Sequence, residues 1–184
     1  MSTPSNMVKV AVVGGEGIGP EVTAQSRRVL EACRDAGLGL RARGHSVTVF
    51  AAVGPADPRL AAAGIRVVCL GQDDIGTSRN KLAFAAQAIW NRPAARRLAE
   101  ELRGLDPRDT VVHVHAFAKA LSPSIGRSLA ASGLALLYTM HEFFLVCPNG
   151  GFYEYPAARI CHRTPMSPGC LTTNCDARSY PRKL

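Results

Sequence analysis

Two histidines stand near the ends of strand-like segments. His115 lies near the end of DTVVHVHAF, and His141 lies near the end of LALLYTMHEF. An imidazole can exchange a proton or donate a hydrogen bond near neutral pH. One histidine at a strand end is more often a structural residue, whereas two at one sheet edge indicate a shared ligand. We therefore predict that His115 and His141 are catalytic or ligand-contacting residues.

A glycine-rich stretch, GGEGIGP, follows the first apolar segment. Gly14, Gly15 and Gly17 can bring backbone N–H groups and a helix N-terminus against a phosphate. The stretch does not fit the dinucleotide pattern G-x-G-x-x-G, because Pro20 takes the last position when counting from Gly15. The next strand also ends without an acidic residue for a ribose. We predict phosphate binding by the three glycines, with a tight turn as the alternative.

Four of the six cysteines lie close together near the C-terminus: Cys147, Cys161, Cys170 and Cys175. Four thiolates can close a tetrahedral zinc site, which would order a segment that cannot bury a core of its own. Since no C-x-x-C pair is present, the spacing leaves a structural zinc site and four free thiols both open. Cys33 and Cys69 stand in apolar patterns and are predicted to be core residues.

Strand-like and helical segments alternate along the chain and must position these side chains. The strands are predicted at 8–15, 45–53, 65–71, 109–117 and 134–143. This alternation predicts an α/β, Rossmann-like parallel sheet of order 3-2-1-4-5. Pro93 is predicted to bend or split the long helical stretch after residue 80, and Ser122 to cap the next helix.

Three regions follow from this pattern. Residues 1–7 are predicted to be disordered, residues 8–146 to form the Rossmann-like domain, and residues 147–184 a loop-rich extension of it that holds the four cysteines. Ligands of such sheets bind beyond the carboxyl ends of the strands, where the strand order reverses. The segments GGEGIG, HVHAF and TMHEFF arrive at that edge.

The charge and the apolar pattern restrict the partners. A formal net charge of +8 favours anionic ligands, but no nucleic-acid-binding pattern accompanies it, so we expect no nucleic acid partner. Neither a signal peptide nor a membrane-spanning stretch is recognisable, which predicts a cytoplasmic protein. The stretch WNRPAARR (90–97) is either a solvated helix face or a contact for an anionic membrane surface.

The segments RARGHSVTVFAA, DTVVHVHAF and everything from LYTMHEFFLVCPNGG onwards resemble the N-terminal, acceptor-side domain of retaining family 4 glycosyltransferases of the GT-B fold. The resemblance covers residues 40–184. It implies one Rossmann-like half of a GT-B enzyme, with the donor bound by a second domain. It also implies that Gly14, Gly15 and His141 approach the diphosphate and sugar of the donor.

The resemblance implies transfer of a sugar from a nucleotide diphosphate sugar to a saccharide or lipid-linked acceptor, as in polysaccharide biosynthesis. No cofactor is then required beyond the donor, apart from the zinc that the cysteines suggest. We expect this chain to be incomplete and inactive alone.

A second resemblance covers only residues 8–31. KVAVVGGEGIGPEV and RRVLEA resemble the opening of isopropylmalate and isocitrate dehydrogenases, and nothing later in the chain continues that similarity. The alternative function is a non-catalytic nucleotide- or phosphate-binding module with a structural zinc site.

Overall fold

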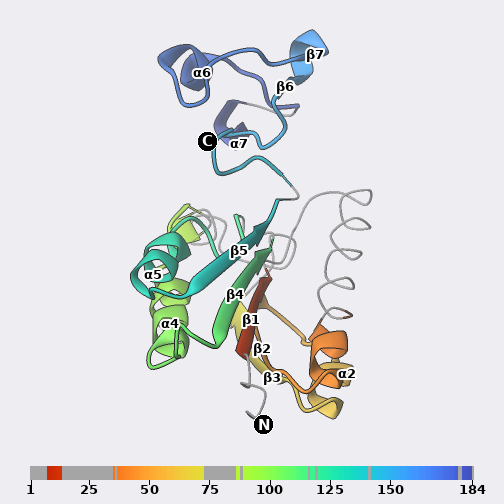
Figure 1. The fold of residues 1–184 in the computed structure, drawn as a ribbon. Coiled ribbons are helices and arrows are strands. Elements are labelled where there is room, and N and C mark those ends of the chain that lie inside the picture. The colour runs from red at the N-terminus through yellow and green to blue at the C-terminus, as the bar shows by residue number, and fades with distance from the viewer. Residues whose placement is uncertain are drawn as a thin grey trace. The chain divides into compact units, whose positions relative to one another are not determined.

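The computed structural model describes residues 8–13, 35, 37–72, 86–87, 89–115, 117–118, 120–140, 142–177 and 180–183 (Figure 1). The chain divides into two compact units, Met1–Thr139 (unit 1) and Met140–Leu184 (unit 2). The division falls after Thr139, whereas the sequence placed the start of the cysteine-containing extension at residue 147.

Unit 1 is built on a five-stranded sheet of order β3-β2-β1-β4-β5. All neighbouring strands are parallel. The predicted α/β fold and strand order are therefore confirmed. The strands are β1 (Val8–Val13), β2 (Ser46–Val53), β3 (Arg66–Gln72), β4 (Thr110–His115) and β5 (Ala135–Thr139).

The main hydrophobic cluster lies on one face of this sheet. Phe50 of β2 and Val112 of β4 are fully buried there, and Leu98 of α4 (Arg92–Leu102) and Ile125 of α5 (Ile125–Ala131) pack on them. Figure 1 shows α4 and α5 together on that side of the sheet. Side chains alternate along a strand, so Phe50 and Ala52 of β2 and Val112 and Val114 of β4 all contribute to this cluster.

A smaller cluster covers the opposite face of β2. Val47 and Val49 pack there with Leu60 of the short helix α2 (Pro58–Ala62) and with Ile65. Leu38 and Leu40, from a helical segment before β2, are partly buried against it. Helices on both faces of a parallel sheet are the arrangement expected of βαβ units.

The helix boundaries confirm one sequence prediction and contradict another. The predicted interruption near Pro93 is present: the helical residues before Trp90 end there, and α4 begins at Arg92 with Pro93 in its first turn, where a missing N–H is tolerated. The prediction for Ser122 is wrong, because the residue that precedes α5 is Ser124, without a side-chain capping bond. Ser122 instead adopts a positive φ of 62° and is fully buried.

Unit 2 contains little regular structure. Its elements are β6 (Tyr153–Glu154), the 3₁₀ turn η1 (Tyr155–Ala157), β7 (Arg159–Ile160), α6 (Pro168–Thr172) and α7 (Tyr180–Lys183). β6 and β7 pair antiparallel as a small hairpin. Among the residues that the structure describes, no helix is long and apolar enough to cross a membrane.

Candidate functional site

Three strand ends lie side by side where the strand order reverses. β1 and β4 are neighbours at the reversal, and Val13, the last residue of β1, is in register with His115. His115 is in turn in register with Thr139, the last residue of β5. In open α/β sheets this carboxyl edge is where ligands bind. The structure therefore places His115 at the predicted edge.

His115 stands beside a second histidine of the same strand. His113 and His115 lie two residues apart, so both project from the sheet face opposite Val112 and Val114, and their ring centroids are 3.9 Å apart. His113 Nε2 lies 2.7 Å from Thr139 Oγ1, and the tautomer decides which group donates. His115 is buried, with 9% of its surface exposed. The pair links β4 to β5 at the edge.

A buried asparagine supports the neighbouring end of the sheet. Asn91 caps α4 by accepting the Ala94 N–H at 3.1 Å, and its side-chain N–H donates to the Ala120 carbonyl at 2.7 Å. Its amide also exchanges two hydrogen bonds with Gln72, the last residue of β3. Asn91 is fully buried. One side chain thus joins β3, α4 and the segment that follows β4.

Two serines complete this network. The Ser122 hydroxyl accepts the Asn91 N–H at 2.8 Å and donates to the Ser124 hydroxyl, which donates to the Asn91 carbonyl at 2.8 Å. These bonds hold Ser122 in its positive-φ conformation, which a non-glycine residue adopts at an energetic cost. The sequence indicated neither Asn91 nor this role of Ser122. A signal was present, since Asn before Arg-Pro is a typical helix start.

The remaining predicted residues of this site lie outside the described part of the chain. These are Gly14, Gly15 and Gly17, which follow Val13 in the sequence, and His141, which follows Met140. Their predicted roles stay predictions.

The segment behind His141 forms a tight turn. Gly150 N–H donates to the Cys147 carbonyl at 2.9 Å, and Phe143 N–H donates to the Gly150 carbonyl at 2.9 Å. Gly150 has a φ of +75°, and a Cβ there would lie 2.8 Å from the Phe144 ring. Only glycine fits this position, so the Pro-Asn-Gly sequence specifies the turn.

All four clustered cysteines belong to unit 2. Cys147, Cys170 and Cys175 are buried, and Cys161 is partly exposed. Burial raises the pKa of Cys175, Lys183 lowers it, and Cys147, Cys161 and Cys170 each raise it further. All three other cysteines therefore lie within electrostatic range of Cys175. Among the residues described, no group of three or more histidine, cysteine, aspartate or glutamate side chains could hold a metal ion.

The two other cysteines were predicted to lie in the core. Cys69 is exposed, so that prediction is wrong for it. Its strand, β3, is at the edge of the sheet, and the cluster on one face takes Val68 rather than Cys69. Cys33 lies outside the described residues.

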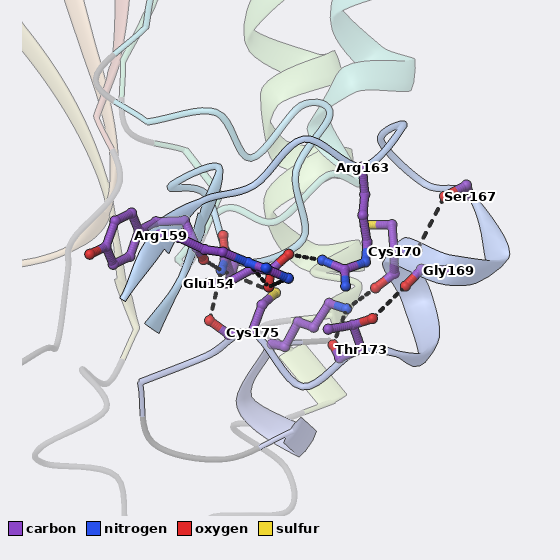
Figure 2. Close-up of polar contacts among 11 residues, drawn as sticks. Glu154, Arg159, Arg163, Ser167, Gly169, Cys170, Thr173 and Cys175 are labelled. Atoms are coloured by element: carbon purple, nitrogen blue, oxygen red, sulfur yellow. Dashed lines mark hydrogen bonds and ion pairs between the residues drawn. The ribbon is translucent and has the colours of Figure 1, made fainter. Parts of the chain in front are cut away.

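The sequence did not single out a buried ion-pair network in unit 2. Glu154 of β6 is buried, and its Oε2 accepts from Arg159 Nε at 3.0 Å and Nη2 at 2.9 Å. Its other oxygen, Oε1, pairs with Arg163. Figure 2 shows the two guanidinium groups converging on this carboxylate. The network ties β7 and the segment after it to β6.

The basic stretch around α4 is exposed. Ile89 and Trp90 are 67% and 51% exposed, and Arg92 and Arg96 lie on the exposed face of α4. Arg97 pairs with Glu101 at 2.7 Å. These side chains place the stretch on the surface of unit 1.

The comparisons with known proteins include a family match over most of the chain and a short match to a dehydrogenase. Residues 26–168 match the model of the Glycosyl transferase 4-like domain, a range that leaves out the glycine-rich stretch, Cys170 and Cys175. The chain is also 71% identical over 31 residues to 3-isopropylmalate dehydrogenase 1 from Bradyrhizobium diazoefficiens, covering 17% of this chain and 8% of that protein.

A solved glycosyltransferase from Rickettsia africae ESF-5 is similar to this chain with a TM-score of 0.47 and 17% identity. The similarity covers 74% of this chain and 30% of that chain, so the chain spans about a third of the solved protein or less. The family match, in contrast, spans most of the chain. The chain therefore belongs to the glycosyl transferase 4-like domain family.

Proposed function

We propose that this chain forms the acceptor-side half of an enzyme that transfers a sugar from a nucleotide diphosphate sugar to a hydroxyl of a saccharide or lipid-linked acceptor. The family match supports glycosyl transfer in general. The observation that carries the proposal is the shared register of Val13, His115 and Thr139 at the reversal of strand order. That edge is where a ligand of such a sheet binds.

The reaction breaks the bond between the anomeric carbon and the donor phosphate and forms one to the acceptor oxygen. The nucleoside diphosphate leaves with the bonding electrons, and the acceptor hydroxyl loses its proton. Negative charge therefore grows on the leaving phosphate. Hydrogen-bond donors fixed at that position lower the barrier more than donors that must reorient.

In this proposal His141 donates to the donor's sugar or phosphates, and Gly14, Gly15 and Gly17 offer backbone N–H groups to the diphosphate. His115 contacts the reacting groups from β4. The contact of its ring with His113, which is itself held to Thr139, restricts the orientation of the His115 ring. His113 is then a positioning residue.

The test uses an enzyme in which this chain is joined to a donor-binding domain. His141→Ala is expected to lower kcat about 10²-fold or more, since removal of one transition-state donor has that effect. His115→Ala is expected to lower kcat also, and His45→Ala, at a partly buried histidine before β2, serves as the control. Wild-type kinetics in folded His141→Ala protein would exclude the role of that histidine.

A further inference from the structure

Two neighbouring apolar side chains, those of Ile89 and Trp90, are exposed just before α4. Each has more than half of its surface in contact with solvent. Their backbone is fixed, because Trp90 N–H donates to the Ala86 carbonyl at 2.9 Å and Arg92 N–H donates to the Trp90 carbonyl at 3.1 Å. Adjacent apolar side chains presented to water on a fixed backbone are a candidate contact surface.

This exposed pair lies at the carboxyl edge of the sheet. It directly precedes Asn91, which is fully buried and bonds to Gln72, the last residue of β3, and to the Ala120 carbonyl after β4. The carboxyl ends of parallel strands meet at one edge, where ligands of such sheets bind. The pair therefore stands beside the ligand-binding edge of unit 1.

The outer face of α4 carries positive charge. The helix lies on one face of the sheet beside α5 and buries its apolar side there (Figure 1). Arg92 and Arg96 are four residues apart, so they share one stripe of the helix, and Arg103 follows at its end; all three are exposed. In the described part of the chain, none of these three arginines forms an ion pair.

The two glutamates of α4 are neutralised by other arginines. Glu101 pairs with Arg66 at 2.6 Å and with Arg97 at 2.7 Å, and only 8% of its side chain is exposed. Glu100 is exposed and pairs with Arg97 at 3.2 Å. The unpaired arginines of the outer face therefore keep their full charge for an external anion.

An anionic lipid surface matches both features of this region. A basic side chain next to such a surface is attracted to the lipid phosphates, and the amphipathic indole of a tryptophan favours the boundary between headgroups and acyl chains. An exposed isoleucine beside it gains by entering the same boundary. A soluble anion, in contrast, would pair with the arginines and leave Ile89 and Trp90 in water.

We propose that Ile89, Trp90, Arg92 and Arg96 dock unit 1 on an anionic lipid surface. The two apolar side chains enter the boundary between headgroups and acyl chains, and the two guanidinium groups contact lipid phosphates. Docking at this place brings the carboxyl edge of the sheet to the lipid surface. It does not depend on the proposed sugar transfer, so either proposal can fail without the other.

The first test measures flotation of the full 184-residue chain with vesicles. We expect binding to vesicles of phosphatidylcholine and phosphatidylserine in equal parts, and little binding to phosphatidylcholine alone. The double variant Arg92→Gln/Arg96→Gln should bind about 25-fold more weakly, about fivefold for each charge removed.

The matched control is Arg43→Gln/Arg108→Gln, which also removes two charges. Both of these arginines are exposed and precede a strand, at the opposite edge of the sheet. That edge is farther from the docked surface than a Debye length of about 10 Å, so binding should change by less than about twofold. Equal losses of binding in the two double variants would show a diffuse attraction of the whole basic chain and overturn the proposal.

The second test uses the wild-type chain and follows Trp90, its only tryptophan. On anionic vesicles its emission should shift to shorter wavelength and be quenched by lipids that are brominated in the upper acyl chain. Trp90→Ala should weaken vesicle binding about tenfold or more, because an aromatic side chain buries a large apolar area.

Three results would overturn the proposal in this second test. One is vesicle binding with unchanged Trp90 emission, and another is the same shift when an acidic peptide or a soluble polyanion replaces the vesicles. The third is normal vesicle binding by Trp90→Ala together with weaker use of a soluble saccharide acceptor in the enzyme that includes a donor-binding domain. That last result would assign Trp90 to the acceptor instead of the lipid surface.

Discussion

Glu154 and Glu100 make the same kind of ion pair in opposite surroundings. The Glu154 side chain is 5% exposed and pairs with Arg159 and Arg163, whereas the Glu100 side chain is 54% exposed and pairs with Arg97 at 3.2 Å. Water and salt screen the exposed pair, and a buried carboxylate depends on its partners for solvation. The two glutamates therefore form a matched comparison.

We predict that Glu154→Gln destabilises unit 2 by about 1.5 to 3 kcal/mol, the range for hydrogen bonds to a charged group. That corresponds to about a ten- to hundredfold loss of amide protection for residues 153–160 in hydrogen exchange. Glu100→Gln should change the protection of α4 by less than about threefold, in line with a surface ion pair. Equal small effects at both positions would show that Glu154 is not a stabilising residue.

Single residues of the candidate site were predictable only in part. His115 could be placed at the sheet edge because strand alternation fixes which segments end there. The bond between His113 and Thr139 could not be predicted, because it depends on the register of β4 against β5, which the sequence does not encode locally. Glu154 was missed for the same reason, since its partners are brought to it by the fold of unit 2.

The strands and helices of unit 1 were more predictable than their ends. Continuous apolar runs rich in valine identify β1 to β4, and their alternation with helical segments leads to the strand order. The helix starts depended on tertiary contacts. Ser122 has the residue type of a cap, but its hydroxyl is used by Asn91 and Ser124 instead. Unit 2 has no periodic pattern, so its elements could not be placed.

Two helix caps of unit 1 differ mainly in burial. We predict that Asn91→Ala costs about 2 to 4 kcal/mol, because it removes a cap worth about 1 kcal/mol and leaves partly buried groups of Gln72 and Ala120 without their partner. Asp57→Ala, which removes the capping bond to Arg59 N–H at the exposed start of α2, should cost about 1 kcal/mol.

The measurement is urea unfolding followed by circular dichroism, with the fluorescence of Trp90 as a second probe. A common m-value for both variants shows that they unfold the same unit. Equal costs for the two substitutions would mean that the Asn91 network does not stabilise the sheet edge.

For the whole chain we predict no measurable sugar transfer. In the part of the chain that the structure describes, one Rossmann-like sheet presents one edge to a ligand. Glycosyl transfer requires donor and acceptor to be held in near-attack geometry with water excluded, which one wall of a crevice cannot provide. Incubation with a panel of nucleotide sugars and saccharide acceptors should therefore yield neither product nor donor hydrolysis above buffer.

Weak binding of a nucleotide or of phosphate is compatible with this prediction. Multiple-turnover transfer or donor hydrolysis by the purified 184-residue chain would contradict it. An enzyme that joins the chain to a donor-binding domain is the positive control, since it contains both walls.

The Asn149 side chain, which bonds to the sulfurs of Cys147 and Cys175, is also a site of chemical degradation in unit 2. Asn149 is followed by Gly150, the pair in which an asparagine most readily cyclises and loses ammonia, because glycine leaves the attacking nitrogen unhindered. In the folded unit that nitrogen donates to the Cys147 carbonyl, and the Asn149 oxygen accepts from Gly151 N–H at 3.0 Å, so both reacting groups are engaged. Once the turn opens, deamidation of Asn149 converts its amide to a carboxylate. The carboxylate has no N–H to donate to Cys175, so the original turn cannot form again. The folded turn thus protects the asparagine that bonds to Cys147 and Cys175.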